Sequence, residues 1–217
     1  MTTDAPDLTE IDLLEPTLDG ALVVSDDVAD LLFREARTTS AFADDEVPDD
    51  AVRAAYDLVR WGPTAMNTVP LRLLLVRSPE ARARLGAHMS DSNRERTLAA
   101  PLTIVAAADT NFHRHLPTLA PWAAGLVDGF EADPERRARM AQQSATIQIG
   151  YLLTGLRAAG LHTGPMGGFD AHGVDAEFFA DNGWTSLLVI NVGQPAAENA
   201  TRPRAPRLDY DDIARTI

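Results

Sequence analysis

Apolar residues recur at the spacing of a helix in three parts of the chain. The first spans 28–37 and follows Ser25 and two acidic residues, a pattern typical of a helix start. The second spans about 49–62, and the third runs from 134 to about 159. The third helix carries no charge over 142–156, so we expect it to be buried on most sides, and the uncharged part is too short to span a bilayer.

Strand-forming residues are concentrated in three further runs. These are Leu71 to Val76, Leu102 to Ala107 and Thr185 to Val192. Helical pieces at about 79–88 and 93–99 separate the first two runs. This alternation of strand and helix predicts an α/β or α+β architecture.

The remaining segments predict how the chain is organised. Residues 1–20 are acidic and lack periodicity, so we expect a mobile N-terminal arm, followed by a single domain over 21–217. Residues 110–130 read as an irregular cover or lid. The Arg- and Pro-rich tail at 194–217 is expected to extend across a neighbouring subunit.

Composition narrows the class of protein. A chain of 217 residues with 45% hydrophobic content can bury the core of one domain. The net charge of −13 argues against binding to nucleic acid or acidic membranes, and there is no Cys for disulfides, thiolate chemistry or Cys-based metal sites. We find no basic and apolar signal sequence, so we expect a cytoplasmic protein.

The cations of the chain are all arginines, because Lys is absent from the sequence. This excludes a Walker-A lysine, a Schiff-base lysine and a lysine general base. Anions must therefore be bound by Arg or by backbone N–H groups. No G-x-G-x-x-G follows a strand, so a dinucleotide would have to dock transiently.

A glycine-rich segment follows the long helix at 164–170, with the sequence GPMGGFD. Because glycine has no Cβ, the adjacent Gly167 and Gly168 could let a ligand come within hydrogen-bond distance of the main chain. The alternative is an ordinary helix exit and turn, which Gly and Pro also mark.

Six segments in the same order carry a resemblance to a known family. They are FREARTTSAF (33–42), WGPTAMNTVP (61–70), SNRERTLAAP (92–101), GLHTGPMGGFD (160–170), INVG (190–193) and PRLDYDDI (206–213). Over residues 28–217 the chain resembles the FMN-dependent nitroreductases, most closely their malonic semialdehyde reductase branch of pyrimidine catabolism. The resemblance implies an α+β, three-layer fold with a mostly antiparallel central sheet flanked by helices. It also implies a homodimer that exchanges C-terminal arms and binds FMN at its interface.

The resemblance assigns the FMN phosphate to basic and hydroxyl side chains. Arg37 ends the first predicted helix, and Thr38 and Thr39 supply hydroxyl donors beside it. Arg207 matches a second phosphate-binding residue, with Arg204 as a weaker candidate. From the residues alone, Arg37 could instead bind a helix C-terminus and a tail arginine could be solvated.

Other cofactor-binding residues follow from the same resemblance. It implies that the partner subunit lays a loop against the flavin, and that a helix presents an amide and a cation near flavin N1 and O2. It also implies that the Gly167 or Gly168 N–H donates to flavin N5. These residues are Pro63, Thr64, Ala65 and Asn67 in the loop, Asn93 and Arg96 on the helix, and Pro165, Met166, Gly167 and Gly168 in the glycine-rich segment.

Each of these assignments has a plainer alternative. The loop could be a helix C-cap and turn, since Gly62 and Pro63 are stop signals, and Arg96 could lie on a solvated helix surface. The sequence also departs from many family members. It has no second cation shortly after Arg37, and it carries Gly167 where many have an acidic residue.

The implied activity is that of an FMN-dependent NAD(P)H oxidoreductase, with NADPH or NADH as a transient co-substrate. The expected reaction reduces a small aldehyde, malonic semialdehyde, to 3-hydroxypropanoate by ping-pong hydride transfer through flavin N5. A broad-specificity nitro or quinone reductase and a non-catalytic flavin-binding protein are the alternatives. We expect no metal site, because His113 and His115 are the nearest approach to ligand spacing.

Two parts of the chemistry stay open at this stage. The proton donor to the product could be water, a lid side chain such as His113, or the ribityl hydroxyls of the flavin. The substrate carboxylate could be bound by Arg72 or Arg114.

Overall fold

The computed structural model describes residues 23–217 and groups the chain into two units, with the boundary between Ala36 and Arg37. The expected N-terminal arm at 1–20 lies outside the described residues, and the single domain over 21–217 stays a prediction. In the first unit, Ser25 precedes α1 (Asp26–Ala29), which continues as the π-helix η1 (Asp30–Arg34).

The first helix ends at Arg34, so its predicted extension to Arg37 was wrong. The Arg34 guanidinium turns back to pair with Asp26 at 2.8 Å and with Asp30 at 2.9 Å. The backbone N–H of Glu35 closes the last wide turn on the Asp30 carbonyl. Arg37 therefore lies in extended backbone at the start of the second unit.

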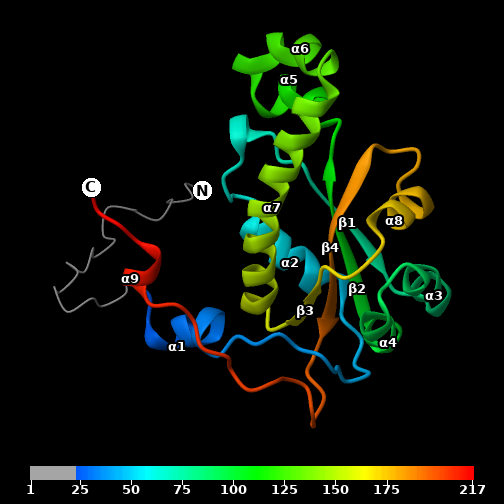
Figure 1. Cartoon of the computed structure of the whole chain (residues 1–217), viewed down its shortest axis with the longest axis vertical. Coiled ribbons are helices and arrows are strands. Elements are labelled where there is room, and N and C mark those ends of the chain that lie inside the picture. The colour runs from blue at the N-terminus through cyan, green and yellow to red at the C-terminus, as the bar shows by residue number, and fades with distance from the viewer. Residues whose placement is uncertain (1–22) are drawn as a thin grey trace, which may run out of the picture. The chain divides into compact units, whose positions relative to one another are not determined.

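The second unit is built on a four-stranded sheet in the order β1-β2-β4-β3 (Figure 1). Its strands are β1 (Leu71–Val76), β2 (Leu102–Asp109), β3 (His162–Met166) and β4 (Trp184–Gly193), and all neighbours are antiparallel. This confirms the α+β fold with an antiparallel sheet. Three of the strands lie where the hydrophobic pattern predicts them.

Strand β3 was not predicted, because Gly164 and Pro165 read as a turn. The structure places it at the sheet edge, where proline is tolerated. On the side away from β4, Thr38 forms a parallel bridge with Thr163, and the Thr39 N–H donates to the Thr163 carbonyl at 2.9 Å. A side chain at Gly164 would collide with the Thr39 carbonyl, so glycine is what allows this close approach.

Helices cover both faces of the sheet. The helices α2 (Asp49–Val59) and α7 (Pro134–Ala158) pack on one face, and α3 (Pro79–Ala87) and α8 (Ala171–Phe178) pack on the other (Figure 1). The helix α4 (Asp91–Ala99) lies beside α3. These three layers follow from the fully buried strand β2, whose side chains alternate between the two cores.

The expected lid is more regular than its sequence suggests. Residues 112–131, called the cap below, form η3 (Phe112–His115), α5 (Leu116–Leu119), η4 (Pro121–Leu126) and α6 (Val127–Glu131). Figure 1 shows α5 and α6 at one end of α7. The rings of Phe112 and Phe130 meet edge to face at 5.4 Å and pack with the first turns of α7, so an aromatic cluster organises a segment that lacks periodicity.

The long helix α7 has the predicted bounds but not the predicted burial. One side packs on the sheet through Ile149, Leu152 and Leu156, whereas Ile147 and Tyr151 on the other side are exposed. The C-terminal tail is likewise exposed over 201–213, including the short helix α9 (Tyr210–Ile213). Among the described residues, no helix is both long and apolar enough to cross a membrane.

Candidate functional site

The edge of the sheet beside β3 carries the first group of predicted residues. Arg37 is partly buried, and its guanidinium makes no hydrogen bond or ion pair with any described residue. Thr39 is 2% exposed, and its Oγ1 is buried without a hydrogen-bond partner in the part of the chain that the structure describes. A free cation and an unsatisfied buried hydroxyl at one strand edge are suited to binding an anion.

The other end of β3 leads into the glycine-rich segment. Gly167 and Gly168 are exposed, and neither backbone N–H donates a hydrogen bond within residues 23–217. Neither has a left-handed backbone. A Cβ at Gly168 would lie 2.8 Å from Asn93 Nδ2 and from Ser90 Oγ, so glycine is needed there for space, whereas nothing lies within 4 Å of the Cβ position at Gly167. Pro165 and Met166 contribute main chain only, since the Met166 side chain packs in the core.

The N-terminal end of α4 fastens the glycine-rich segment in place. The Gly168 carbonyl accepts hydrogen bonds from the Ser90 N–H at 3.0 Å and from Asn93 Nδ2 at 3.0 Å. Arg96, one turn further along α4, is partly buried and has no ion-pair partner among the described residues. The structure therefore brings Asn93 next to Gly168, as expected for one site, and leaves the Arg96 charge available.

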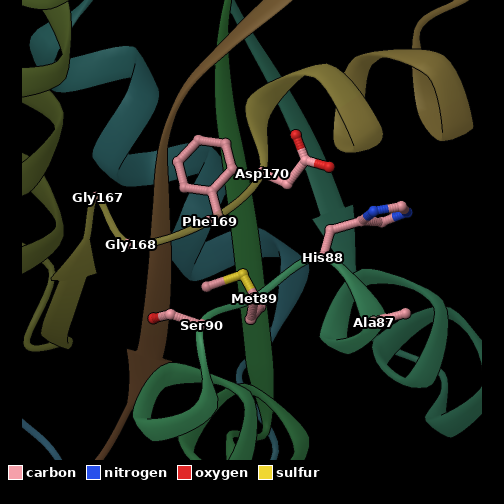
Figure 2. Close-up of a pocket in the computed structure, with 8 residues that line it drawn as sticks. All are labelled: Ala87, His88, Met89, Ser90, Gly167, Gly168, Phe169 and Asp170. Atoms are coloured by element: carbon pink, nitrogen blue, oxygen red, sulfur yellow. The ribbon is translucent and has the colours of Figure 1, made fainter.

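A hollow of about 540 Å³ lies between the end of α3 and the glycine-rich segment. Figure 2 shows the Ser90 side chain on the side of Gly167 and Gly168, with His88 and Asp170 on the opposite side. Because Thr38 pairs with Thr163, four residues before Gly167, the phosphate-binding candidates and the free amides are separated by about 13 Å along the strand. The unpaired groups thus form an elongated row, with the Arg37 cation at one end and the Gly167 and Gly168 amides at the other.

The loop between α2 and β1, residues 63–70, has a strained backbone. It contains η2 (Ala65–Asn67), and three of its residues have left-handed φ values: Met66 at 54°, Asn67 at 53° and Val69 at 41°. Val69 is the least expected of these, because it is β-branched and precedes a proline. Such conformations cost about 1–3 kcal/mol each and persist only where the surroundings impose them.

Hydrogen bonds hold this loop at many points. The Val69 N–H donates to Thr64 Oγ1 at 3.2 Å, and the Asn67 side-chain amide donates to the Leu119 carbonyl of the cap at 2.7 Å. The outward positions are Pro63, Ala65 and Asn67, all exposed, whereas Met66 packs toward the cap. Three of the four predicted loop residues thus face outward, and the fourth, Thr64, acts as an internal acceptor.

The predicted tail arginines, Arg204 and Arg207, lie in the exposed part of the C-terminal tail. The tail pairs with residues 39–43 through several backbone hydrogen bonds and becomes exposed from Thr201 onward. The Arg207 guanidinium donates to its own neighbours, the carbonyls of Ala205 and Pro206. The phosphate role of Arg207 and the weaker candidate Arg204 therefore stays a prediction that needs a second chain.

His113, one of the candidate proton donors, is completely buried in the structure. Its Nε2 lies 2.5 Å from the Glu131 carboxylate, and Arg137 NH1 lies 3.3 Å from the same carboxylate. The bond to His113 holds the pKa of Glu131 below its ordinary value, despite the opposing effect of desolvation. This cluster fastens α6 to η3 and α7, which is a structural role within the cap.

The two candidate carboxylate anchors differ. Arg72 is engaged, since it pairs with the buried Asp109 at 2.7 Å and donates to the carbonyls of Val69 and Leu71 at 2.9 Å. Arg114 on η3 is exposed, and its guanidinium has no hydrogen-bond or ion-pair partner in the described part of the chain. No group of three or more His, Asp or Glu residues within 23–217 could bind a metal ion.

Comparison with known families agrees with this geometry. The model of the nitroreductase family matches residues 33–194, which is most of the chain. The chain belongs to the nitroreductase family. A Streptomyces coelicolor protein, named as a candidate NADH dehydrogenase/NAD(P)H nitroreductase, is 48% identical over 91% of this chain and 100% of its own length.

Solved nitroreductase structures share the fold. A nitroreductase from Exiguobacterium sibiricum in complex with FMN superposes with a TM-score of 0.76 at 16% identity, covering 91% of this chain and 100% of its own. An NAD(P)H:FMN oxidoreductase from Staphylococcus epidermidis gives 0.76 at 18% identity, covering 90% and 98%. These likenesses confirm the three-layer fold of a nitroreductase.

Sequence reasoning missed several polar residues of this nitroreductase-family protein. Ser90 was not singled out, although its hydroxyl lies beside Gly168. The polar side chains Ser144 and Gln148 were missed because they sit in an uncharged helix that reads as core. The available signal was that Gln148 is a polar residue in a stretch expected to be buried. A buried polar side chain needs a hydrogen-bond partner, so Gln148 could have been expected to hold another part of the chain.

Proposed function

We propose that this nitroreductase is an FMN-dependent NAD(P)H oxidoreductase that reduces a small aldehyde. The observation that carries the proposal is the row of free donors along β3, from the unpaired Arg37 to the unpaired amides of Gly167 and Gly168. A ligand with an anionic end and a flat polar end matches such a row. The relatives named for NAD(P)H and FMN support the same cofactors.

The residues present fit FMN on structural grounds. The buried Thr39 Oγ1 lacks a partner, which is costly unless a ligand supplies one. Arg37 can bind a phosphate dianion through its planar fork of donors, and the exposed Thr38 can add a hydroxyl donor. With no Lys in the chain, arginine and backbone N–H groups are the available phosphate ligands.

Residues at the opposite end of the row would orient the flavin ring. Asn93 is fixed beside Gly168 by its hydrogen bond and offers its amide oxygen, and Arg96 supplies a cation that favours negative charge near flavin N1 and O2. The Gly167 or Gly168 N–H would donate to flavin N5. When bound, FMN supplies a carrier that takes hydride from NAD(P)H and gives it to a carbonyl carbon.

We further propose that the active form is a homodimer with exchanged C-terminal arms. The uncharged exposed side of α7 lies near other exposed apolar residues, since the Gly62 Cβ position touches the Tyr151 ring and Trp61 is 81% exposed. The tail exposes Leu208, Tyr210 and Ile213. These surfaces are suited to a second copy, whose loop 63–70 would then lie against the flavin.

The dimer is tested by sedimentation of the FMN-loaded protein. Obligate dimers typically bury on the order of 2,000 Å² or more, so we expect one species at twice the chain mass of 23.4 kDa. A stable FMN-loaded monomer would contradict the arm exchange and the placement of the loop.

The proposed substrate is malonic semialdehyde, which gives 3-hydroxypropanoate by gain of hydride at the aldehyde carbon and a proton at the oxygen. Its carboxylate needs a cation, and Arg114 is the more suitable of the two candidates because Arg72 is already engaged. A broad-specificity nitro or quinone reductase would use the same flavin site without that requirement. A non-catalytic flavin-binding protein would bind FMN without turnover.

One experiment separates these functions. The FMN-loaded protein is mixed anaerobically with NADPH or NADH, and then with malonic semialdehyde, a nitroaromatic or a quinone, while flavin absorbance is recorded. We expect bleaching by the nicotinamide and fastest recovery with malonic semialdehyde. Recovery only with the nitroaromatic or quinone supports the broad reductase, and absence of bleaching supports the flavin-binding protein.

A further inference from the structure

Two polar side chains of α7 point into the protein and not toward solvent. Ser144 is 1% exposed and Gln148 is 3% exposed, and they lie one helical turn apart. A buried amide or hydroxyl is costly unless it is hydrogen-bonded, so their partners indicate why they are there.

Both side chains accept hydrogen bonds from the loop at 63–70 and the residue after it. Ser144 Oγ accepts from the Ala65 N–H at 3.3 Å, and Gln148 Oε1 accepts from the Leu71 N–H at 3.0 Å. These two amides flank all three left-handed residues of the loop. The same two α7 residues therefore fix the strained segment at both of its ends.

Further contacts close the loop between these two points. Arg72 NH1 donates to the Val69 carbonyl at 2.9 Å, and the Asp109 N–H donates to the Pro70 carbonyl at 2.8 Å. A backbone with left-handed Met66, Asn67 and Val69 would relax without such restraints. Among the hydrogen bonds of the described residues, those to Ser144 and Gln148 come from α7, within its uncharged part at 142–156.

We infer that Ser144 and Gln148 are positioning residues that hold loop 63–70 in the shape in which it contacts the flavin of the partner subunit. This inference rests on the proposed function, because it takes the outward edge at Pro63, Ala65 and Asn67 as the flavin-facing surface. The exposed side of α7 carries Ile147 and Tyr151, which follow Ser144 and Gln148 by three residues each. One rigid helix thus positions the loop and presents the surface that a second copy would cover.

The test replaces Gln148 by Met, which keeps the length of the side chain and removes the acceptor. Ser144→Ala is the second variant, and Ser186→Ala is the control, because Ser186 is also buried but bonds the Ala171 carbonyl and does not touch the loop. Flavin-stripped dimers are titrated with FMN, and the visible spectrum of the bound flavin and the hydrogen exchange of peptides covering 60–71 are recorded.

We expect Gln148→Met to speed exchange in the loop, to weaken FMN binding about tenfold and to shift the bound flavin spectrum. Ser144→Ala should change the same three readouts by a smaller amount, since its hydrogen bond is longer, and Ser186→Ala should change none. If Gln148→Met does not fold, the comparison of Ser144→Ala with Ser186→Ala decides the inference.

Faster loop exchange with unchanged FMN affinity and spectrum would overturn the positioning role while leaving the proposed function intact. Unchanged exchange in both variants would also overturn it. Failure of the unmodified dimer to bind FMN would instead overturn the proposed function, and the positioning role with it.

Discussion

Two segments of this nitroreductase-family protein expose their main chain in different ways. Loop 63–70 uses non-glycine residues in left-handed conformations, and hydrogen bonds to other parts of the chain hold it in shape. The glycine-rich segment has ordinary angles at Gly167 and Gly168, and its amides are free among the described residues. The loop therefore presents a surface of fixed shape, whereas the glycine-rich segment presents backbone N–H groups that are free to donate to a ligand.

Loop 63–70 and the glycine-rich segment should therefore be sensitive to different mutations. In the loop, backbone shape depends on distant side chains, so changes at those side chains are the way to disturb it. In the glycine-rich segment, the donors are available because no side chain stands in the way, so adding one is the disruptive change.

The largest effect is expected for Gly168→Val. A Cβ at Gly168 would lie 2.8 Å from both Asn93 Nδ2 and Ser90 Oγ, so the segment would be pushed away from α4. FMN should be largely retained through Arg37, while flavin reduction by NADPH in stopped flow slows roughly 10²-fold, as for a misplaced preorganised donor. Gly129→Val in the cap, where nothing lies within 4 Å of the Cβ position, is the control.

Reduction at the wild-type rate in a folded, flavin-loaded Gly168→Val protein would remove the glycine-rich segment from the hydride-transfer site. It would then be a turn that α4 happens to hold.

Arg37→Ala should weaken binding rather than chemistry. Loss of a hydrogen bond to a charged group costs about 1.5–3 kcal/mol, so the Kd for FMN should rise by roughly 10- to 150-fold in a fluorescence titration. Arg53→Ala on α2 is the matched control, because the Arg53 side chain is exposed and its guanidinium makes no hydrogen bond or ion pair within residues 23–217. Equal FMN affinity of the Arg37→Ala and wild-type proteins would exclude Arg37 from the site.

The strained loop predicts an inverted order of two substitutions at Val69. Alanine normally stabilises a protein relative to glycine, but the φ of 41° penalises any residue with a Cβ. Val69→Gly should therefore unfold at higher denaturant than Val69→Ala, by about 1 kcal/mol in free energy of unfolding. If alanine is the more stable variant, the left-handed conformation at Val69 is not maintained in solution.

The smallest effect concerns the strand that leads into the glycine-rich segment. Burial, with a further contribution from Arg157, lowers the pKa of His162 from its ordinary value of 6.5. Because the folded pKa lies below the unfolded one, the stabilising contribution is present above pH 6.5 and is lost as the pH falls through the folded pKa. His162→Gln should flatten this acid-side loss in urea melts, and an unchanged pH profile would exclude His162 as its source.

The fold was predictable where burial imposes a period. The ranges expected for β1, β2, α2 and α7 agree with the structure. Burial of one face, or of both, requires apolar residues at regular spacing along the chain, and this spacing is visible in the sequence. Strand β3 was hidden because an edge position tolerates Pro165, and the cap because its aromatic cluster has no repeating spacing.

The candidate site was predictable only as residue types. The resemblance named Asn93 and the glycines, and the structure brings them together through the Gly168 carbonyl. The left-handed backbone of the loop could not be foreseen, because the hydrogen bonds that flank it come from Ser144 and Gln148, which lie 79 and 77 residues away from their partners. The binding of one FMN phosphate by both Arg37 and Arg207 depends on a second chain and stays a prediction.

Whether the free amides of the glycine-rich segment bind the flavin can be measured by the amide NMR spectrum of the ¹⁵N-labelled, flavin-stripped dimer during addition of FMN. We expect the Gly167 and Gly168 amide signals to shift and to become protected from solvent exchange, because these free donors would contact the flavin. The signal of Gly129 in the cap should stay in place. FMN binding with both glycine signals unmoved would show that these amides do not contact the flavin.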